Sequence, residues 1–332
     1  MSVQITIVGL GQIGSSIGLA LKAHNVNVHR VGHDKDPQAA KESQKVGAVD
    51  DVKYNLPASI REAKIVILAL PLAEMHETLK LIAPDLQEGA LILDTAPAKA
   101  TVAAWAQELL PPGRFYIGLT PAINPEYLHG TDFGVKAARA DLFEKGLMVV
   151  NAPRGTPGNV FNLAMELVNL MGAMPLLMDT AEADGVFSAM HVLPQLAAAA
   201  LLDATVDQPG WQEARKLAGR PYATVTAGAV YHDDVLSLGE SALDNRENVV
   251  RLLNAYISSL IMLRDDIDAN DRPALTRRLE SALKGRIRWF DERIAAEWLK
   301  GEGQPIDAPS FGDRVNQMLF GGLMTDRQKQ RK

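Results

Sequence analysis

A polar break interrupts an apolar, helix-like run over residues 187–202, FSAMHVLPQLAAAALL, in which His191, Pro194 and Gln195 stand close together. Histidine and glutamine are costly to bury without partners, and a proline inside a helix removes a hydrogen bond. Two interpretations of His191 remain open: an acid or base that acts on a substrate, or a core histidine hydrogen-bonded to a carbonyl. Gln195 could orient a polar group of a substrate.

A glycine-rich turn follows the first apolar run and opens a helical segment. It consists of Gly9, Leu10, Gly11, Gln12, Ile13 and Gly14. Between a strand and a helix, this G-x-G-x-x-G spacing is typical of dinucleotide binding. The first glycine allows the tight turn, the second lets the backbone approach a pyrophosphate, and the third lets the helix pack against the strand. All six residues are therefore expected to contact a dinucleotide at the helix N-terminus.

Asp34 ends the second expected strand, twenty residues after Gly14. A carboxylate at this place accepts hydrogen bonds from the ribose hydroxyls and repels a 2′-phosphate, which favours NAD. Lys35 and Arg30 leave NADP open as an alternative, because a nearby cation could hold the phosphate.

Short β-branched runs alternate with helical segments in the first half. Strands are expected over residues 4–9, 28–34, 65–71, 90–95, 114–120, 147–152 and 174–179. Such runs predict an α/β fold, a Rossmann-type doubly wound parallel sheet that binds ligands beyond the carboxyl ends of its strands. Leu70, Pro71 and Thr95 should line the cofactor there. Lys99 is either an acid or base at this site, if desolvated, or a solvated lysine of a first helical turn.

Strand signals stop after Asp179, and the rest of the sequence predicts an all-helical C-terminal domain. We expect a dinucleotide-binding domain over 1–179, a helical substrate and dimerisation domain over 180–312, and a tail over 313–332. Over 243–268 the apolar residues recur at helical spacing on a face wider than one packing contact requires. This face either belongs to the core or meets a second subunit, and a homodimer through the helical domain is predicted. A further helix should start with Asp271 as its cap and Pro273 in its first turn.

The composition of the chain limits the kinds of binding partner that we expect. The chain has no cysteine and a net charge of −6 without a basic stripe, which disfavours disulfides, thiolate metal sites and nucleic-acid binding. The opening segment has neither the pattern of a secretion signal nor the length of a membrane span. No metal-ligand spacing is legible. We expect a cytoplasmic protein with a small-molecule substrate, and neither a nucleic acid, a membrane nor a metal as partner.

Six segments, in order, resemble the prephenate/arogenate dehydrogenase family over about residues 3 to 290. They are IVGLGQIGSSIGLALK, VGHDKDP, KVGAVDD, AKIVILALPL, LILDTAPAKA and DNRENVVRLLNAYISSLIMLRDDIDANDRPAL. The last is the most discriminating, because many dehydrogenases share the glycine motif. The resemblance implies an NAD(P)-dependent oxidation of a ring hydroxyl with loss of carbon dioxide, in a cleft between a Rossmann domain and a helical domain.

The resemblance also implies site residues that this chain lacks. The family's base histidine, assisting serine, two substrate-facing histidines and carboxylate-binding arginine correspond here to Thr120, Pro97, Val192, Gln195 and Ala227. His191 stands at a serine position of the same helix. Thr120, Lys99, His191 and Gln195 are therefore the expected catalytic residues, acting on a changed substrate such as a modified cyclic carboxylic acid. A non-catalytic NAD(H)-binding sensor or partner protein is the alternative.

Overall fold

The computed structural model describes residues 2–24, 28–230 and 235–296. These residues form two compact units. The first unit contains Met1–Leu70, Glu74–Thr180 and, at the end of the described chain, residues 290–296. The second contains Pro71–Ala73 and Ala181–Trp289. The expected tail, 313–332, lies outside the described residues.

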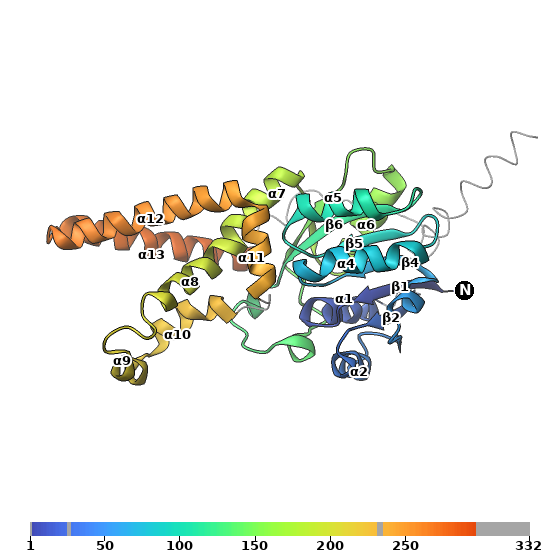
Figure 1. The fold of residues 1–332 in the computed structure, drawn as a ribbon, viewed down its shortest axis with the longest axis horizontal. Coiled ribbons are helices and arrows are strands. Elements are labelled where there is room, and N and C mark those ends of the chain that lie inside the picture. Colours follow the sequence, from blue (N-terminus) through green and yellow to red (C-terminus); the bar gives the residue numbers. More distant parts are fainter. Residues whose placement is uncertain (1, 25–27, 231–234, 297–332) are drawn as a thin grey trace, which may run out of the picture. The chain divides into compact units, whose positions relative to one another are not determined.

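Unit 1 is built on an eight-stranded sheet with the order β3-β2-β1-β4-β5-β6-β7-β8. The strands are β1 (Val3–Val8), β2 (Val28–His33), β3 (Asp51–Val52), β4 (Ala63–Leu68), β5 (Leu91–Asp94), β6 (Phe115–Ala122), β7 (Leu147–Asn151) and β8 (Met174–Leu177). This order around a mostly parallel sheet confirms the Rossmann-type α/β fold (Figure 1).

Two features of the sheet differ from the expectation. β3 is only two residues long, too short for an apolar pattern to reveal it. β6 and β7 pair in antiparallel orientation, whereas every other neighbouring pair is parallel. A parallel return needs a crossover, usually an α-helix. The described segment between β6 and β7 instead holds two short 3₁₀ turns, η2 (Pro125–Tyr127) and η3 (Gly134–Ala137).

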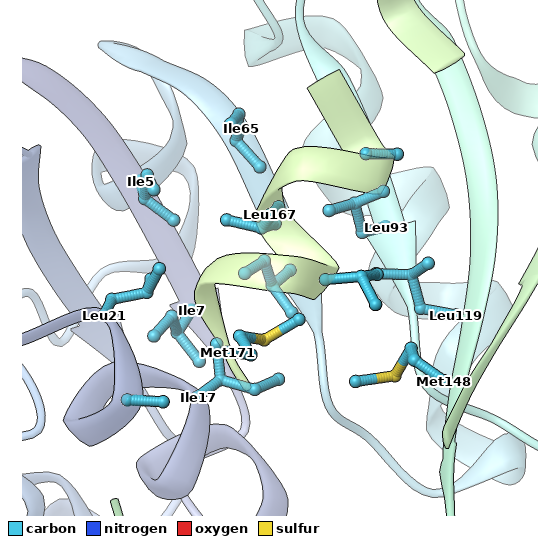
Figure 2. Close-up of a cluster of buried hydrophobic side chains, with 14 of the residues drawn as sticks. Ile5, Ile7, Ile17, Leu21, Ile65, Leu93, Leu119, Met148, Leu167 and Met171 are labelled. Carbon is cyan, nitrogen blue, oxygen red and sulfur yellow. The ribbon is translucent and has the colours of Figure 1, made fainter. Parts of the chain in front are cut away.

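Buried side chains cover both faces of the sheet. On one face, α1 (Gln12–Ala23) and α6 (Gly158–Leu170) pack their apolar stripes onto the strands. Figure 2 shows this cluster, which includes Ile5, Ile7, Ile17, Leu21, Ile65, Leu93, Leu167 and Met171. Val66 and Ile92 alternate with the cluster residues along β4 and β5 and are also fully buried. Burial on both faces explains why these strands read as continuous apolar runs.

The remaining helices of this half of the chain are α2 (Pro37–Lys45), α3 (Leu56–Ile60), α4 (Leu72–Ile82) and α5 (Lys99–Leu109). Asp36 and Asn55 cap α2 and α3, because their side chains accept hydrogen bonds from the backbone N–H groups of Gln38 and Ala58. Each of these two helices also has a proline in its first turn, which fits the free N–H positions there.

Unit 2 is helical in its described residues, which agrees with the predicted C-terminal half. Its elements are α7 (Thr180–Phe187), the π-helical turn η4 (Ser188–Val192), α8 (Leu193–Asp203), α9 (Trp211–Leu217), α10 (Arg220–Thr226), η5 (Ala227–Val230), α11 (Val235–Asp244), α12 (Arg246–Asp268) and α13 (Arg272–Ala295). Asp271 caps α13 by accepting a hydrogen bond from the N–H of Ala274, as predicted. The last residues of α13, from Phe290, group with unit 1.

The continuous run Thr180–Asp203 is long and apolar enough to cross a membrane by length and composition alone. One such run is weak evidence, because core helices of soluble proteins pass the same test. Within unit 2 this run contacts α10, α11 and α12.

Candidate functional site

The turn after β1 is shaped by glycines at its two ends. Gly9 has φ +89°, a left-handed conformation that side chains rarely adopt, and a Cβ there would lie 2.3 Å from the carbonyl oxygen of Ala69. A Cβ on Gly14 would lie 1.9 Å from the carbonyl oxygen of Gly9, so only glycine lets α1 approach the turn this closely. At Gly11, by contrast, no described atom lies within 4 Å of a built Cβ. The middle of the turn therefore leaves space for a ligand against the backbone.

Helix α1 begins at this open position. Gly11 is its N-cap, and no described side chain caps the first turn, which also contains no acidic residue. The first N–H groups of a helix lack intrahelical partners and carry a partial positive charge. Together with the open space at Gly11, they form a site that suits the pyrophosphate of a dinucleotide.

Asp34 is fixed beside the same turn, at the end of β2. One of its carboxylate oxygens accepts a hydrogen bond from the N–H of Leu10 at 2.6 Å, and the other accepts one from the N–H of Asp36 at 2.8 Å. The side chain is only half-buried. Its remaining lone pairs can therefore accept the hydroxyl groups of a ribose.

The two cations that could have held a 2′-phosphate are engaged elsewhere. Arg30 is buried, forms an ion pair with Asp50 and donates to the carbonyl oxygens of Gly18 and Gly47. Burial raises the pKa of Asp50, but the hydrogen bonds and charge of Arg30 outweigh it and hold this pKa below its usual value. Lys35 pairs with Glu74.

The ends of β4 and β5 supply the next residues expected at the site. Leu70 and Pro71 follow β4, half-buried, at the point where the chain passes from unit 1 to unit 2. The Cδ2 atom of Leu70 lies 3.0 Å from a Cβ built on Gly9, so this side chain borders the glycine turn. Thr95 follows β5, and its N–H donates to the carbonyl oxygen of Leu68 at 3.0 Å. In unit 1 the glycine turn and the ends of β4 and β5 thus lie along one edge of the sheet.

Lys99 is fully buried at the start of α5 and is not a solvated first-turn lysine. Its ammonium forms an ion pair with Asp94 at 2.9 Å and also donates to the backbone oxygens of Asp94 and Leu119, at 3.4 and 3.2 Å. An ammonium with three donors engaged has no lone pair to accept a proton and no donor left for a ligand. A role as acid or base would require this arrangement to open.

Thr120 lies on β6, two residues beyond the position that pairs with Asp94. Its side chain is buried, and its hydroxyl donates to the carbonyl oxygen of Ala96 at 3.0 Å. Lys99 and Thr120 are therefore brought together through one turn, residues 94–99. The hydroxyl oxygen of Thr120 retains lone pairs that could accept a hydrogen bond.

His191 and Gln195 lie together in unit 2. His191 belongs to the π-helical turn η4 and is half-buried, whereas Gln195 in α8 is buried. The side-chain N–H of Gln195 donates to the carbonyl oxygen of His191 at 3.0 Å, which satisfies part of its amide within the helix. Single π-helical turns occur frequently at functional sites.

Asp94, Tyr116 and Gly118 were not among the predicted site residues. Tyr116 donates a hydrogen bond to Asp94 at 2.6 Å, and Asp94 in turn pairs with Lys99. In the sequence Asp94 reads as a strand end, and Tyr116 as an ordinary strand aromatic. Asp94 and Lys99 are five residues apart in the chain, whereas the pairing of β5 with β6 brings Tyr116 to them and sets Gly118 opposite Asp94.

The geometry of unit 1 defines a class: a nucleotide-binding α/β protein of the dehydrogenase type. A model of the prephenate dehydrogenase nucleotide-binding domain matches residues 17–176. The prephenate dehydrogenase of Bacillus subtilis is 24% identical over 280 residues, which span 84% of this chain and 74% of that protein. The cyclohexadienyl dehydrogenase of Zymomonas mobilis is 25% identical over 291 residues, spanning 85% of this chain and 94% of that protein.

Two solved structures share the fold. Prephenate dehydrogenase from A. aeolicus, in complex with hydroxyphenyl propionate and NAD⁺, has a TM-score of 0.75 at 21% identity and covers 87% of this chain and 98% of its own. Synechocystis arogenate dehydrogenase has a TM-score of 0.66 at 22% identity and covers 86% and 100%. These matches confirm the resemblance to the prephenate/arogenate dehydrogenase family seen in the chain's segments.

Proposed function

We propose that this protein is an NAD-dependent oxidoreductase that transfers a hydride between the nicotinamide and a small, cyclic carboxylic acid. The observation that carries the proposal is the glycine turn, with its open helix N-terminus and Asp34 fixed beside it by the N–H of Leu10. A protein that no longer bound a dinucleotide would not need to keep these residues in register. The relatives named above are dehydrogenases, which supports an oxidoreductase.

NAD rather than NADP is the proposed cofactor. The Asp34 carboxylate would repel a 2′-phosphate, and both neighbouring cations are paired with carboxylates, Arg30 with Asp50 and Lys35 with Glu74. The related A. aeolicus enzyme was solved with NAD⁺. When bound, NAD would supply the hydride acceptor, while the turn residues Gly9–Gly14 and Asp34 bind and orient it.

The proposed chemistry uses residues that differ from the family's pattern. Thr120 has a buried hydroxyl that can relay or orient a proton, although threonine does not take up a proton at neutral pH as imidazole does. His191 is the proposed acid or base of the helical domain, and Gln195 the residue that orients a polar group. The loss of the family's histidines should reduce turnover of prephenate itself, because an acid–base group contributes roughly 10²–10⁴-fold to the rate.

The test measures NAD and NADP reduction by the purified protein with prephenate, arogenate and related ring acids, beside a fluorescence titration of NADH. We expect NADH to bind, and a ring acid other than prephenate to be the better substrate. Rapid turnover of prephenate would contradict the proposed change of substrate. Binding of NADH without turnover of any substrate would instead favour the sensor alternative, and absence of NADH binding would overturn the cofactor site.

We also propose a soluble, cytoplasmic homodimer that associates through unit 2. Helices α12 and α13 are joined by the ion pair between Asp266 and Arg278, and both leave large apolar side chains exposed. Those on α12 include Val250, Tyr256, Ile257, Leu260, Ile261 and Met262, and those on α13 include Leu279, Leu283, Ile287 and Trp289. Patches of this kind usually mark an interface.

The dimer is tested by the mass in solution of the wild type and of Ile257→Glu, with Glu247→Lys on the same helix as a charge-change control. Ile257 is 49% exposed, so a glutamate there leaves the fold intact but opposes burial in an interface. A monomer for Ile257→Glu beside a dimeric wild type and control supports the proposal. A monomeric wild type, or a variant with unchanged mass, overturns it.

A further inference from the structure

We propose that Asp94, Lys99 and Tyr116 are positioning residues whose buried network holds the turn after β5 in place for the nicotinamide half of the cofactor. The inference rests on the proposed function, since it presumes that a dinucleotide binds. It assigns Lys99 a task different from that of an acid or base. It adds Asp94 and Tyr116, which are not visible as site residues in the sequence.

The first step is that the network is closed within the protein. The Lys99 ammonium donates to one carboxylate oxygen of Asp94 and to the backbone oxygens of Asp94 and Leu119. The Asp94 carboxylate accepts from Lys99, from the N–H of Ala96 at 2.8 Å and from the Tyr116 hydroxyl at 2.6 Å. Asp94 and Lys99 are fully buried, and Tyr116 is 7% exposed. Polar networks whose members are all satisfied rigidify their surroundings.

The second step is that the chain makes room for this network. A Cβ on Gly118 would lie 2.8 Å from Cδ of Lys99, and 3.2 Å from both the ammonium nitrogen and the Tyr116 hydroxyl. Glycine at 118 is therefore what allows the lysine stem to pass over β6. If the lysine moved aside, it would lose hydrogen bonds that hold its ammonium at the far end.

The third step is that the network acts on the turn, residues 95–98, and not on the sheet alone. Ala96 is held from both sides, because its N–H donates to Asp94 and its carbonyl accepts from the Thr120 hydroxyl. Thr95 is tied to the end of β4 through the carbonyl of Leu68. Lys99 therefore acts on the turn through the Asp94 carboxylate, which holds Ala96, and through Ala96 on the Thr120 hydroxyl.

The fourth step locates this turn on the cofactor. In a doubly wound sheet the dinucleotide crosses the carboxyl edge at the switch point, here between β1 and β4. The glycine turn and Asp34 lie on the β1–β2 side, which serves the adenosine half. The turn after β5 lies on the other side, which serves the nicotinamide half. A buried ion pair adds little net stability, because desolvation offsets its attraction, so fixing this geometry is the role left to it.

The experiment compares the binding of NADH with that of ADP-ribose, which lacks the nicotinamide, in the full chain. The variants are Tyr116→Phe, which deletes one hydroxyl, and Asp94→Asn with Lys99→Met together, which removes both charges at similar volume. We expect the dissociation constant of NADH to rise about fivefold in each variant, because the loss of binding free energy should be about that of one hydrogen bond. The constant for ADP-ribose should stay within about twofold of the wild type, inside the usual scatter of such comparisons.

Tyr127→Phe is the matched control. Tyr127 is also in unit 1 and also donates its hydroxyl to a carboxylate, that of Asp141 at 2.8 Å, but in the loop after β6. This control should leave both constants unchanged, and Gly118→Ala, which displaces Lys99 by crowding, should repeat the NADH-specific loss. Equal weakening of NADH and ADP-ribose, or no change in either, overturns the inference while leaving the proposed cofactor intact. A wild type that binds neither ligand refutes the proposed function instead.

Discussion

Replacing Asp34 with alanine should convert the preference for NADH into one for NADPH. The carboxylate has its two oxygens fixed by the N–H groups of Leu10 and Asp36, at 2.6 and 2.8 Å. It therefore approaches the ribose site with little freedom. Its removal deletes the acceptor for the ribose hydroxyls and, at the same time, the charge that opposes a 2′-phosphate.

The size of the effect follows from the exposure of this carboxylate. A hydrogen bond to a charged group contributes about 1.5–3 kcal/mol. Asp34 is half-exposed and shares its lone pairs with two backbone N–H groups, so water replaces part of what is lost. We therefore take the total for both hydroxyls at about 2 kcal/mol, which corresponds to a roughly 30-fold rise in the dissociation constant of NADH. That of NADPH should stay level or fall, because the repulsion is gone.

Fluorescence titration with both reduced cofactors measures this ratio. Asp36→Ala is the control, since it removes the same charge two residues later and deletes only the cap of α2, at a cost of about 1 kcal/mol of stability. If both variants weaken NADH binding equally, the effect comes from the lost charge or from folding and not from contact with the ribose. If the NADH-to-NADPH ratio does not move in Asp34→Ala, the assignment of Asp34 to the ribose is refuted.

Three further predictions concern the same unit. Gly14→Ala should destabilise the fold by about 3 kcal/mol, because its Cβ would lie 1.9 Å from the backbone oxygen of Gly9, and denaturant unfolding measures the loss. Gly11→Ala has open space around its Cβ, so its free energy of unfolding should lie within about 1 kcal/mol of that of the wild type. It should nevertheless bind NADH at least about tenfold more weakly, since its methyl group meets the pyrophosphate; equal affinities would place the ligand elsewhere. Asp50→Asn should lower stability by about 1–2 kcal/mol at pH 7. Because the pKa of Asp50 is depressed in the folded state, this difference is present above about pH 4 and disappears as the pH falls through the folded pKa, which unfolding curves along a pH series would show.

The elements with strong local signals could be predicted from the sequence. The glycine turn carries its own stereochemistry, since Gly9 and Gly14 are required by a positive φ and a close approach. Central strands such as β4 and β5 show as apolar runs because both faces of the sheet are buried there. The same double burial hides the direction of β7, because a central strand is equally apolar in parallel and antiparallel pairing.

The positions that depend on register could not be predicted in the same way. Lys99 looks identical in sequence whether it is solvated at the start of a helix or buried beneath one. What decides between these states is the missing side chain at Gly118 on β6, which leaves room for the lysine stem, together with the ion pair to Asp94 at the end of β5. Asp94 and Lys99 are five residues apart in one segment, but the contact with Gly118 arises only when β5 and β6 pair.

One physical explanation accounts for the π-helical turn and for the position of Gln195 at the polar break formed by His191, Pro194 and Gln195. Pro194 lacks an N–H, so a regular α-helix through this segment would leave the carbonyl of Met190 without its partner at i+4. The chain forms a π-helical turn over Ser188–Val192 just before the proline, with the N–H of Leu193 bonded to the carbonyl of Ser188. Gln195 then donates from its side chain to the carbonyl of His191, inside the same turn. Pro194 and Gln195 thus belong to one local distortion that sets where His191 lies. Replacing Gln195 with leucine should therefore shift the surroundings of the His191 ring, seen as a changed imidazole NMR signal, whereas an unaltered signal would show that the turn is held by the backbone alone.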